Sequence, residues 1–464
     1  MATQRNEKLG ALIAEAKCTH TQLAAAVARI GVEAGHPECT RIARSHVSHW
    51  VGGTLPSGPV PMFVCEALSR RLRRAVTLGE AGFATAALVL PAALNWHSDP
   101  VTSLADLGRT DVDLERRRLL AGSAYAVAAL ALPTGDWWER MAEHARHTDR
   151  AAVNAYTVGH GDVAAVRETV AFFSRLDQRH GGGHGRRALV LYLQSDVCEY
   201  LDGRFADDRV RREMFSTAAE LAYLAGWTAF DNAQHAIAQP YFTSAVKLAA
   251  MADDAPMAAH VLRAMAHQAL ELGYLKEALR LAEASMRGPR YATASPRERA
   301  LLGVVHARTL AATGDKRAAV AALLRAEDDL GHASPGIEEP GRTFFFGEAA
   351  LAHEAARTLA AVGDTKGALT EFRRSVRTRN GAAFARTHAV TLGYLGAVQA
   401  EAGSIEEACA TWSRALDGMD GIHSGRTRQV VVNMRRSLSP FRKRGVKLVA
   451  ELDRRAAEHL SATV

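Results

Sequence analysis

The sequence of 464 residues has few aromatic residues and few cysteines. Aromatic residues make up 6% of the chain, and the five cysteines are scattered, with no Cys-x-x-Cys pair among them. This odd number and wide spacing argue against a disulfide framework or a zinc ribbon, and they favour a reducing compartment. The cysteines are Cys18, Cys39, Cys65, Cys198 and Cys409.

Signals for export and for catalysis are also missing. The first residues hold no apolar run of the kind found in a signal peptide, so we expect a cytoplasmic protein that does not associate with membranes. His353-Glu354 begins like the helical motif of zinc proteases, but position 357 is Arg and the second metal-binding His is absent. No Gly-x-Ser-x-Gly motif or pair of catalytic carboxylates stands out. We therefore expect no enzyme, no metal site and no cofactor.

The sequence is rich in alanine instead. Hydrophobic residues make up 48% and charged residues 23%, as in ordinary globular proteins. Ala-rich segments with few β-branched residues favour helices that pack closely, and no long strand-like alternation interrupts them. The prediction is an all-α fold. The net charge of +7 permits nucleic-acid binding without establishing it.

Helix-breaking residues divide the chain into segments. Pro91 and Gly108 lie in a stretch that reads as a linker, and Gly181–Gly185 reads as a flexible loop between two helices. The expected segments are a helix-turn-helix domain over 1–85, a linker over 86–111, a helical connecting region over 112–215, helical repeats over 216–426 and capping helices over 427–464.

The repeats align on a small residue between the two helices of each pair, at steps of 40, 41, 49 and 40 residues. These residues are Ala233, Gly273, Gly314, Gly363 and Gly403. The positions seven before, five after and twelve after them are all small: Gly226, Ala266, Ala307, Ala356, Gly396; Ala238, Ala278, Ala319, Ala368, Ala408; Ala245, Ser285, Ala326, Ser375, Ala415. The positions nine after are mostly bulky, as Phe242 and Trp412 show. This pattern resembles tetratricopeptide repeats, in which paired helices touch through short side chains.

A candidate DNA-reading helix extends from Arg41 to Val51. Helix-turn-helix domains place one short helix in the major groove with its polar face toward the bases. Here Ile42, Val47 and Trp50 fall on one face and polar residues on the other. The preceding helix opens with Thr21 as its expected N-cap, where a helix N-terminus can hold a phosphate. The side chains expected to contact DNA are Gln22, Arg44, Ser45, His46, Ser48 and His49.

Several stretches together resemble actinobacterial regulators that join a repressor-type (XRE) helix-turn-helix to a tetratricopeptide array. They are Thr21-Gln22-Leu23-Ala24, Val47-Ser48-His49-Trp50-Val51-Gly52-Gly53, Pro56, Gly58-Pro59-Val60-Pro61, Glu66-Ala67-Leu68-Ser69-Arg70-Arg71-Leu72, Phe173-Ser174-Arg175-Leu176-Asp177, Gly181-Gly182-Gly183-His184, Ala225-Gly226-Trp227-Thr228-Ala229-Phe230-Asp231 and His267-Gln268-Ala269-Leu270. The resemblance covers nearly the full length and implies transcriptional control. Thr54 stands where such domains usually carry a basic residue, and the connection from Gly31 to Thr40 is longer than in compact repressors.

The first helices of the repeats predict a ligand groove. In such arrays these helices line the concave face, and Arg forks bind carboxylates and other anions. The groove residues are Tyr223, Trp227, Arg263, His267, Arg308, His353 and Arg357. They suit a peptide, a small anionic ligand or a protein partner. The alternative is that Trp227 belongs to the core and the Arg side chains pair with Glu271 or Glu354.

Two functions compete for this sequence. The first is a sequence-specific DNA-binding regulator, acting as a homodimer on paired half-sites, whose repeats receive a signal. The second is a protein-interaction scaffold with a vestigial helix-turn-helix domain. The exposed face of the Arg41–Val51 helix favours the first, because it carries hydrogen-bond donors and no acidic or large apolar residue.

Overall fold

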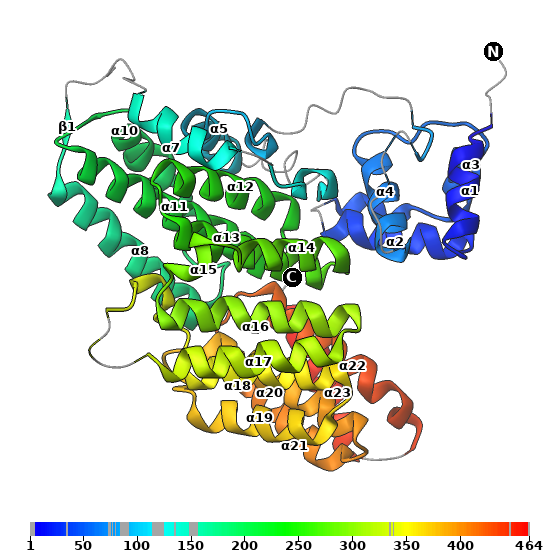
Figure 1. Ribbon diagram of the computed structural model, residues 1–464. Coiled ribbons are helices and arrows are strands. Elements are labelled where there is room, and N and C mark those ends of the chain that lie inside the picture. Colours follow the sequence, from blue (N-terminus) through cyan, green and yellow to red (C-terminus); the bar gives the residue numbers. More distant parts are fainter. Residues whose placement is uncertain are drawn as a thin grey trace.

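The computed structural model is all-α, and its helices pack in consecutive pairs (Figure 1). It describes residues 5–33, 36–72, 76, 78, 80–83, 92–113, 125–133, 136–147, 156–333, 336, 338–444 and 447–462. The first six residues of the expected linker and residues 114–124 and 148–155 of the expected connecting region lie outside these ranges.

A small N-terminal domain has its own core. Its helices are α1 (Glu7–Glu15), α2 (His20–Glu33), the 3-10 helix η1 (Pro37–Arg41), α3 (Arg44–Val51) and α4 (Val60–Leu72). Leu9, Val27, Val47 and Phe63 are fully buried where α1, α2, α3 and α4 meet. The apolar positions recognised in the sequence thus form one hydrophobic cluster.

Two details of this domain correct the sequence prediction. The helix predicted to read DNA begins at Arg44 and not at Arg41, because the backbone is extended at Ile42 and Ala43. Helix α2 is capped by Thr19 and not by Thr21: Thr19 Oγ1 accepts the Gln22 backbone N–H at 3.2 Å. Gln22 Oε1 accepts the Thr19 backbone N–H in return, at 3.0 Å. This reciprocal pair is a capping box.

The second half of the expected linker is folded. It contains the 3-10 helix η2 (Ala92–Leu94) and helix α5 (Pro100–Val112). Leu104 of α5 is fully buried in the core of the repeat array. Lys247 from the array is also buried, and its Nζ donates to Asn95 O at 3.0 Å and to Ser98 Oγ at 2.9 Å. These contacts fix the segment on the array.

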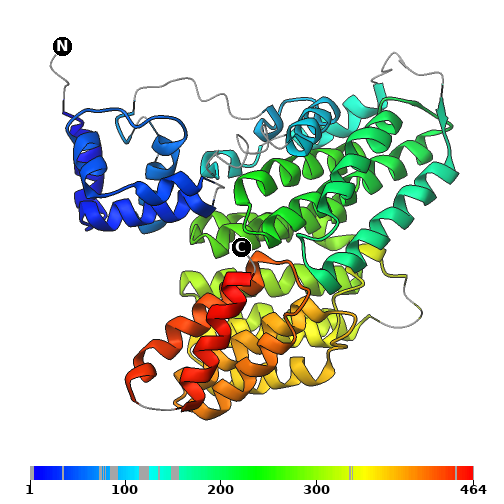
Figure 2. The same cartoon turned by 180° about the vertical axis from the view of Figure 1, so that it is seen from behind.

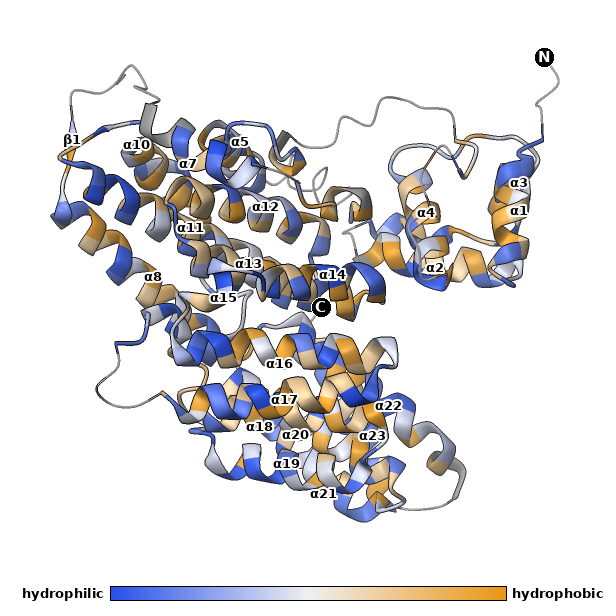
Figure 3. Ribbon diagram, viewed as in Figure 1, coloured by the Kyte–Doolittle hydropathy of each residue, from blue (hydrophilic) through white to orange (hydrophobic). Residues whose placement is uncertain are grey.

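The connecting region leads into a long helix, α8, that flanks the array. Its elements are η3 (Val127–Leu130), α7 (Trp137–His147), β1 (Thr157–Val158), α8 (His160–His180), α9 (Arg186–Tyr192), the π-helical turn η4 (Leu193–Val197), α10 (Cys198–Leu201) and β2 (Arg204–Phe205). The two short strands pair in parallel, with Thr157 opposite Arg204. Hydrophilic and hydrophobic residues alternate along α8 (Figure 3), and its buried apolar side chains are Val163, Val166 and Val170.

Five helix pairs follow, and two further helices close the chain. The pairs are α11 (Asp208–Asp231) with α12 (His235–Met251), α13 (Ala255–Glu271) with α14 (Leu275–Ser285), α16 (Pro296–Thr313) with α17 (Lys316–Gly331), α18 (Glu348–Val362) with α19 (Thr365–Thr378), and α20 (Ala385–Glu401) with α21 (Ile405–Asp417). The remaining elements are α15 (Pro289–Ala292), η5 (Gly341–Thr343), α22 (Gly425–Leu438), η6 (Ser439–Arg444) and α23 (Lys447–Ala462).

The backbone confirms the repeat register. All five aligning residues have a positive φ, between 60° at Ala233 and 94° at Gly314, in the turn between paired helices. Each of the small residues at the other aligned positions is buried where two helices touch. At Gly226 a Cβ would lie 2.8 Å from the Phe242 ring, so the bulky position of one helix occupies the space left by its partner. The close approach expected from the sequence is therefore present.

The array curls back on itself. Helix α20 of the last pair contacts α8, and α22 packs on α20 with α23 behind it (Figures 1 and 2). The N-terminal domain stands beside the array and touches it near the start of α14, where the Tyr274 hydroxyl donates to the Glu66 carboxylate of α4.

Replacing Ala319 by Leu tests the register. Ala319 is fully buried where α17 meets its neighbours, so the larger side chain should overpack the contact and cost about 1–3 kcal/mol of unfolding free energy. The matched control is Ala321→Leu on the same helix, where the side chain is only partly buried. Urea or thermal denaturation measures both. Equal stability of the two variants would contradict the register.

Candidate functional site

Helix α3 presents a polar face to solvent. Arg44, Ser45, His46 and His49 are exposed and Ser48 is partly so. Val47, Trp50 and Val51 on the opposite face are buried in the N-terminal domain. Figure 1 places α3 and α1 on the edge of this domain that is farthest from the array, so no helix of the array covers the polar face. The face predicted from the sequence is therefore present and accessible.

Local hydrogen bonds engage three of the six predicted DNA-contacting residues. His46 Nδ1 accepts the Ala43 backbone N–H at 3.1 Å and so caps α3. Ser48 Oγ donates to Arg44 O at 3.2 Å and lies 3.0 Å from His20 Nδ1. The oxygen of Gln22 is engaged in the cap of α2, which leaves its amide NH2 as the outward donor. Arg44, Ser45 and His49 are exposed, and their side chains make no hydrogen bond to any other described residue.

The seven predicted groove residues come together, but inside the array. Tyr223, Trp227, Arg263, His267, Arg308 and His353 are all buried, and only Arg357 is partly exposed. Adjacent members touch: Arg263 Nη2 donates to the Tyr223 hydroxyl at 2.9 Å, and the Trp227 and His267 ring centroids are 6.0 Å apart. The seven positions do not line one open concave groove, because α8, α20 and α22 pack around them, and of the seven only Tyr223 and Trp227 line the larger hollow beside α8.

Acidic neighbours neutralise part of this cluster, as the alternative interpretation held. Arg308 Nη1 lies 2.9 Å from Glu354 Oε2. Glu271 Oε1 lies 2.9 Å from His267 Nε2 and 3.4 Å from Arg426 Nη2. Burial, with the nearby Arg308 charge, lowers the pKa of His267 to about 4, so this imidazole is neutral at pH 7. Arg308 and His267 are therefore occupied by the protein's own side chains.

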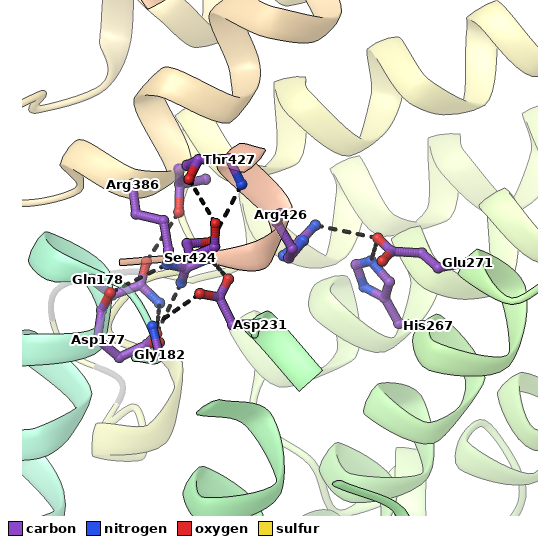
Figure 4. A network of polar contacts seen from close by, with 11 residues as sticks. Asp177, Gln178, Gly182, Asp231, His267, Glu271, Arg386, Ser424, Arg426 and Thr427 are labelled. Carbon is purple, nitrogen blue, oxygen red and sulfur yellow. Dashed lines mark hydrogen bonds and ion pairs between the residues drawn. The ribbon is translucent and has the colours of Figure 1, made fainter. Parts of the chain in front are cut away.

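A buried three-part ion pair closes the ring of helices (Figure 4). Arg386 of α20 donates from Nη2 to Asp177 Oδ2 of α8 at 2.9 Å, and from Nη1 to Asp231 Oδ1 of α11 at 3.0 Å. All three side chains are at most 2% exposed. Burial and the neighbouring Asp231 charge raise the pKa of Asp177 to about 6, although Arg386 opposes the shift.

The glycine loop belongs to the same junction, and this corrects its expected flexibility. The Gly182 backbone N–H donates to Asp231 Oδ2 at 2.9 Å, and the Gly183 N–H donates to His423 O at 2.9 Å. A Cβ at Gly182 would lie 2.4 Å from Thr228 O, so only glycine fits there. The loop is packed between the end of α11 and the segment that precedes α22.

Two hollows adjoin this interior. A cavity of about 70 Å³ is lined by residues that include Arg263, Arg379, Arg386 and Arg426. A larger groove of about 760 Å³ lies between α8, α11 and residues 338–345. The groove and the cavity share Gln178, Trp227 and Phe345 as lining residues, so they lie next to each other.

The sequence interpretation missed Arg379, Arg386 and Arg426 as interior residues. They lie outside the repeat positions used to locate the groove: Arg379 follows the end of α19, and the other two lie in the first turns of α20 and α22. The burial of these Arg side chains cannot be predicted from the spacing of residues in the sequence, because it depends on contacts with segments far away in the chain.

Comparison with known proteins bears on the N-terminal domain alone. A family model described as the SP15 N-terminal domain matches residues 9–84. The chain thus carries an SP15 N-terminal domain followed by a largely helical part. No curated protein matches the chain. Across the described residues, no helix is long and apolar enough to cross a membrane, and no group of three or more His, Cys, Asp or Glu residues could hold a metal ion.

Replacing Arg386 by Met tests whether its ion pairs hold α20 against α8 and α11. The change leaves Asp177 and Asp231 buried without their shared cation, so it should cost about 3–5 kcal/mol of unfolding free energy. Arg373→Met is the control, because Arg373 is 51% exposed and its pair with Glu407 should contribute about 1 kcal/mol or less. Urea denaturation at pH 7 measures both; similar stabilities would contradict a closing role.

The loss in Arg386→Met should depend on pH. Without the cation, the pKa of Asp177 should rise further above its unfolded value. A carboxyl with a raised folded pKa contributes stability below its unfolded pKa and loses it as the pH rises through the folded pKa. The variant should therefore be closer to wild type at pH 5 than at pH 8. A destabilisation that is constant across this range would show that the carboxylates are not the cause.

Proposed function

We propose that this chain is a sequence-specific DNA-binding transcription regulator whose helical array receives a signal. The observation that carries the proposal is the polar face of α3, exposed on the outer edge of a compact helical domain. A helix–connection–helix unit that presents one short helix in this way suits the major groove. Residues 1–90 hold ten Lys or Arg against six Glu, which gives this segment a net charge of +4 and suits an anionic partner such as DNA.

The resemblance to XRE-type regulators with tetratricopeptide-like repeats supports the same proposal. The paired helices, their small contact residues and their positive-φ turns are features that such arrays share. The DNA-bound form in this proposal is a homodimer, because one small domain offers few base contacts and half-sites usually come in pairs.

A direct contact gives the array a route to the DNA-binding domain. Glu66 of α4 is buried, pairs with Arg70 at 2.6 Å and accepts the Tyr274 hydroxyl of the array. The Tyr125 ring stacks on Tyr274 with the centroids 5.7 Å apart. A displacement at the start of α14 would therefore act on α4, which packs against α2 and α1.

Substitution of Arg44 tests DNA reading. Arg44→Ala should weaken binding to a captured genomic fragment by about 1–3 kcal/mol, because the exposed guanidinium is the strongest base-edge donor on α3. Gln22→Ala should weaken binding to all sequences more evenly, because its donor faces the backbone phosphate. Arg373→Ala, far from α3 in the sequence, is the control.

Fluorescence anisotropy with genomic fragments selected by the tagged protein provides the measurement. Wild-type protein that selects no fragment above random DNA would overturn the proposal. The chain would then be better described as an interaction scaffold whose helix-turn-helix fold no longer reads DNA.

A further inference from the structure

The interior cavity carries more positive charge than the surrounding carboxylates neutralise. Four guanidiniums line it, from Arg263, Arg379, Arg386 and Arg426. Arg386 is paired with Asp177 and Asp231, and Arg426 with Glu271. The one carboxylate in the lining, Glu354, is paired with Arg308. Two cations, Arg263 and Arg379, remain without an ion pair among the described residues.

Both of these guanidiniums are buried and bonded only to neutral acceptors. Arg263 is 2% exposed, and its Nη2 contacts the Tyr223 hydroxyl and, at 3.2 Å, His260 Nε2. Arg379 is 8% exposed, and its Nη2 donates to Ala349 O at 2.8 Å and to Ser375 Oγ at 3.1 Å. The Nε atom of each is buried and has no hydrogen-bond partner in the part of the chain that the structure describes.

Nearby imidazoles do not add to this charge. Burial and the Arg263 charge lower the pKa of His260 well below its usual value, and burial does the same for His353. Burial also lowers the pKa of Arg379 to about 10, which still leaves it charged at pH 7. Buried charges are normally paired, so two unpaired guanidiniums beside a cavity call for a bound anion.

The size of the cavity limits what that anion can be. One water needs roughly 10–15 Å³ of such a volume, so about 70 Å³ holds about five to seven waters, which is room for the five heavy atoms of phosphate but not for a bulky ligand. Around the cavity, six guanidiniums stand against four carboxylates, and this surplus of two positive charges matches a dianion. The cations are Arg263, Arg308, Arg357, Arg379, Arg386 and Arg426, and the carboxylates are Asp177, Asp231, Glu271 and Glu354. A substituent on the anion would lie toward Trp227 and Phe345, which also line the adjacent groove.

We propose that the interior cavity binds a compact dianionic oxyanion, free phosphate or the phosphate of a phosphomonoester, between Arg263 and Arg379. The anion supplies the negative charge that the protein lacks at this point, and each guanidinium directs its unpartnered N–H toward an anion oxygen. The proposal deepens the proposed function, because it gives the signal received by the array a chemical class.

Titration calorimetry and thermal unfolding of the full chain test the site in a chloride buffer. The probes are inorganic phosphate, glycerol 3-phosphate and acetate, with sodium chloride at matched ionic strength. Phosphate should raise the melting temperature by several degrees more than chloride, while the monoanion acetate should not. Tighter binding of glycerol 3-phosphate would assign the site to a phosphomonoester, and equal or weaker binding to free phosphate.

Arg263→Met and Arg379→Met should each reduce phosphate affinity at least tenfold. In chloride alone both variants should melt no lower than wild type, because each removes an uncompensated buried charge. A merely structural Arg would instead lower the melting temperature. Arg373→Met, at an exposed ion pair, should retain the wild-type phosphate response.

Three outcomes would overturn the site. They are a wild type that phosphate stabilises no more than chloride, two Met variants that keep the full response, and two Met variants that both fail to fold. The samples contain no DNA, so a negative result here leaves the DNA-binding proposal intact. A failed DNA titration likewise does not affect the anion site, which the phosphate measurements test on their own.

Discussion

The buried contact of Arg386 with Asp177 and Asp231 is the constraint on which the shape of the molecule depends. It joins α20, α8 and α11, which are far apart in sequence, and all three side chains are withdrawn from water. A buried charge is costly unless its partners are present, so each of the three segments requires the other two. In an open solenoid each repeat contacts only its neighbours. Here the first and last pairs also contact α8, so the array forms one closed unit.

Closure determines the chemistry of the interior. Side chains that would face solvent in an open array are covered by α8, α20 and α22, and their charges must be balanced locally. Glu271 and Glu354 balance Arg426 and Arg308. The balance is incomplete on the side where Arg263 and Arg379 meet the cavity. On the anion proposal, the negative charge that balances these fixed cations comes from a ligand and not from the chain.

Sequence reasoning succeeded where the constraint is local and repeated. The turns at Gly273 and Gly403 and the small residues between paired helices follow from short-range geometry, and so does the buried face of Val47 and Trp50. It failed where the outcome depends on distant segments. The curvature of an array is the sum of small rotations between pairs, so no single motif shows that the ring closes. The folding of α5 onto the array was hidden for the same reason. The N-cap at Thr19 could have been predicted from the sequence, because Gln22 follows it by three residues as in a capping box. Thr21 was chosen instead because threonine is equally common at N-caps.

The array and the N-terminal domain share a short physical connection. Helix α13 carries Arg263 and His267 toward the interior and ends at the Gly273 turn, directly before Tyr274. The Tyr274 hydroxyl in turn donates to Glu66 of the N-terminal domain. An anion that draws Arg263 toward Arg379 would act on α13, and the tightly packed helix would transmit the displacement to its end rather than absorb it. The Glu66 carboxylate is buried and also pairs with Arg70, so Tyr274 and Glu66 can rearrange in few ways without losing a buried contact. On the proposed function, the signal therefore needs no large rearrangement of the array: a small shift of one helix is enough to change how α4 holds the domain that carries α3.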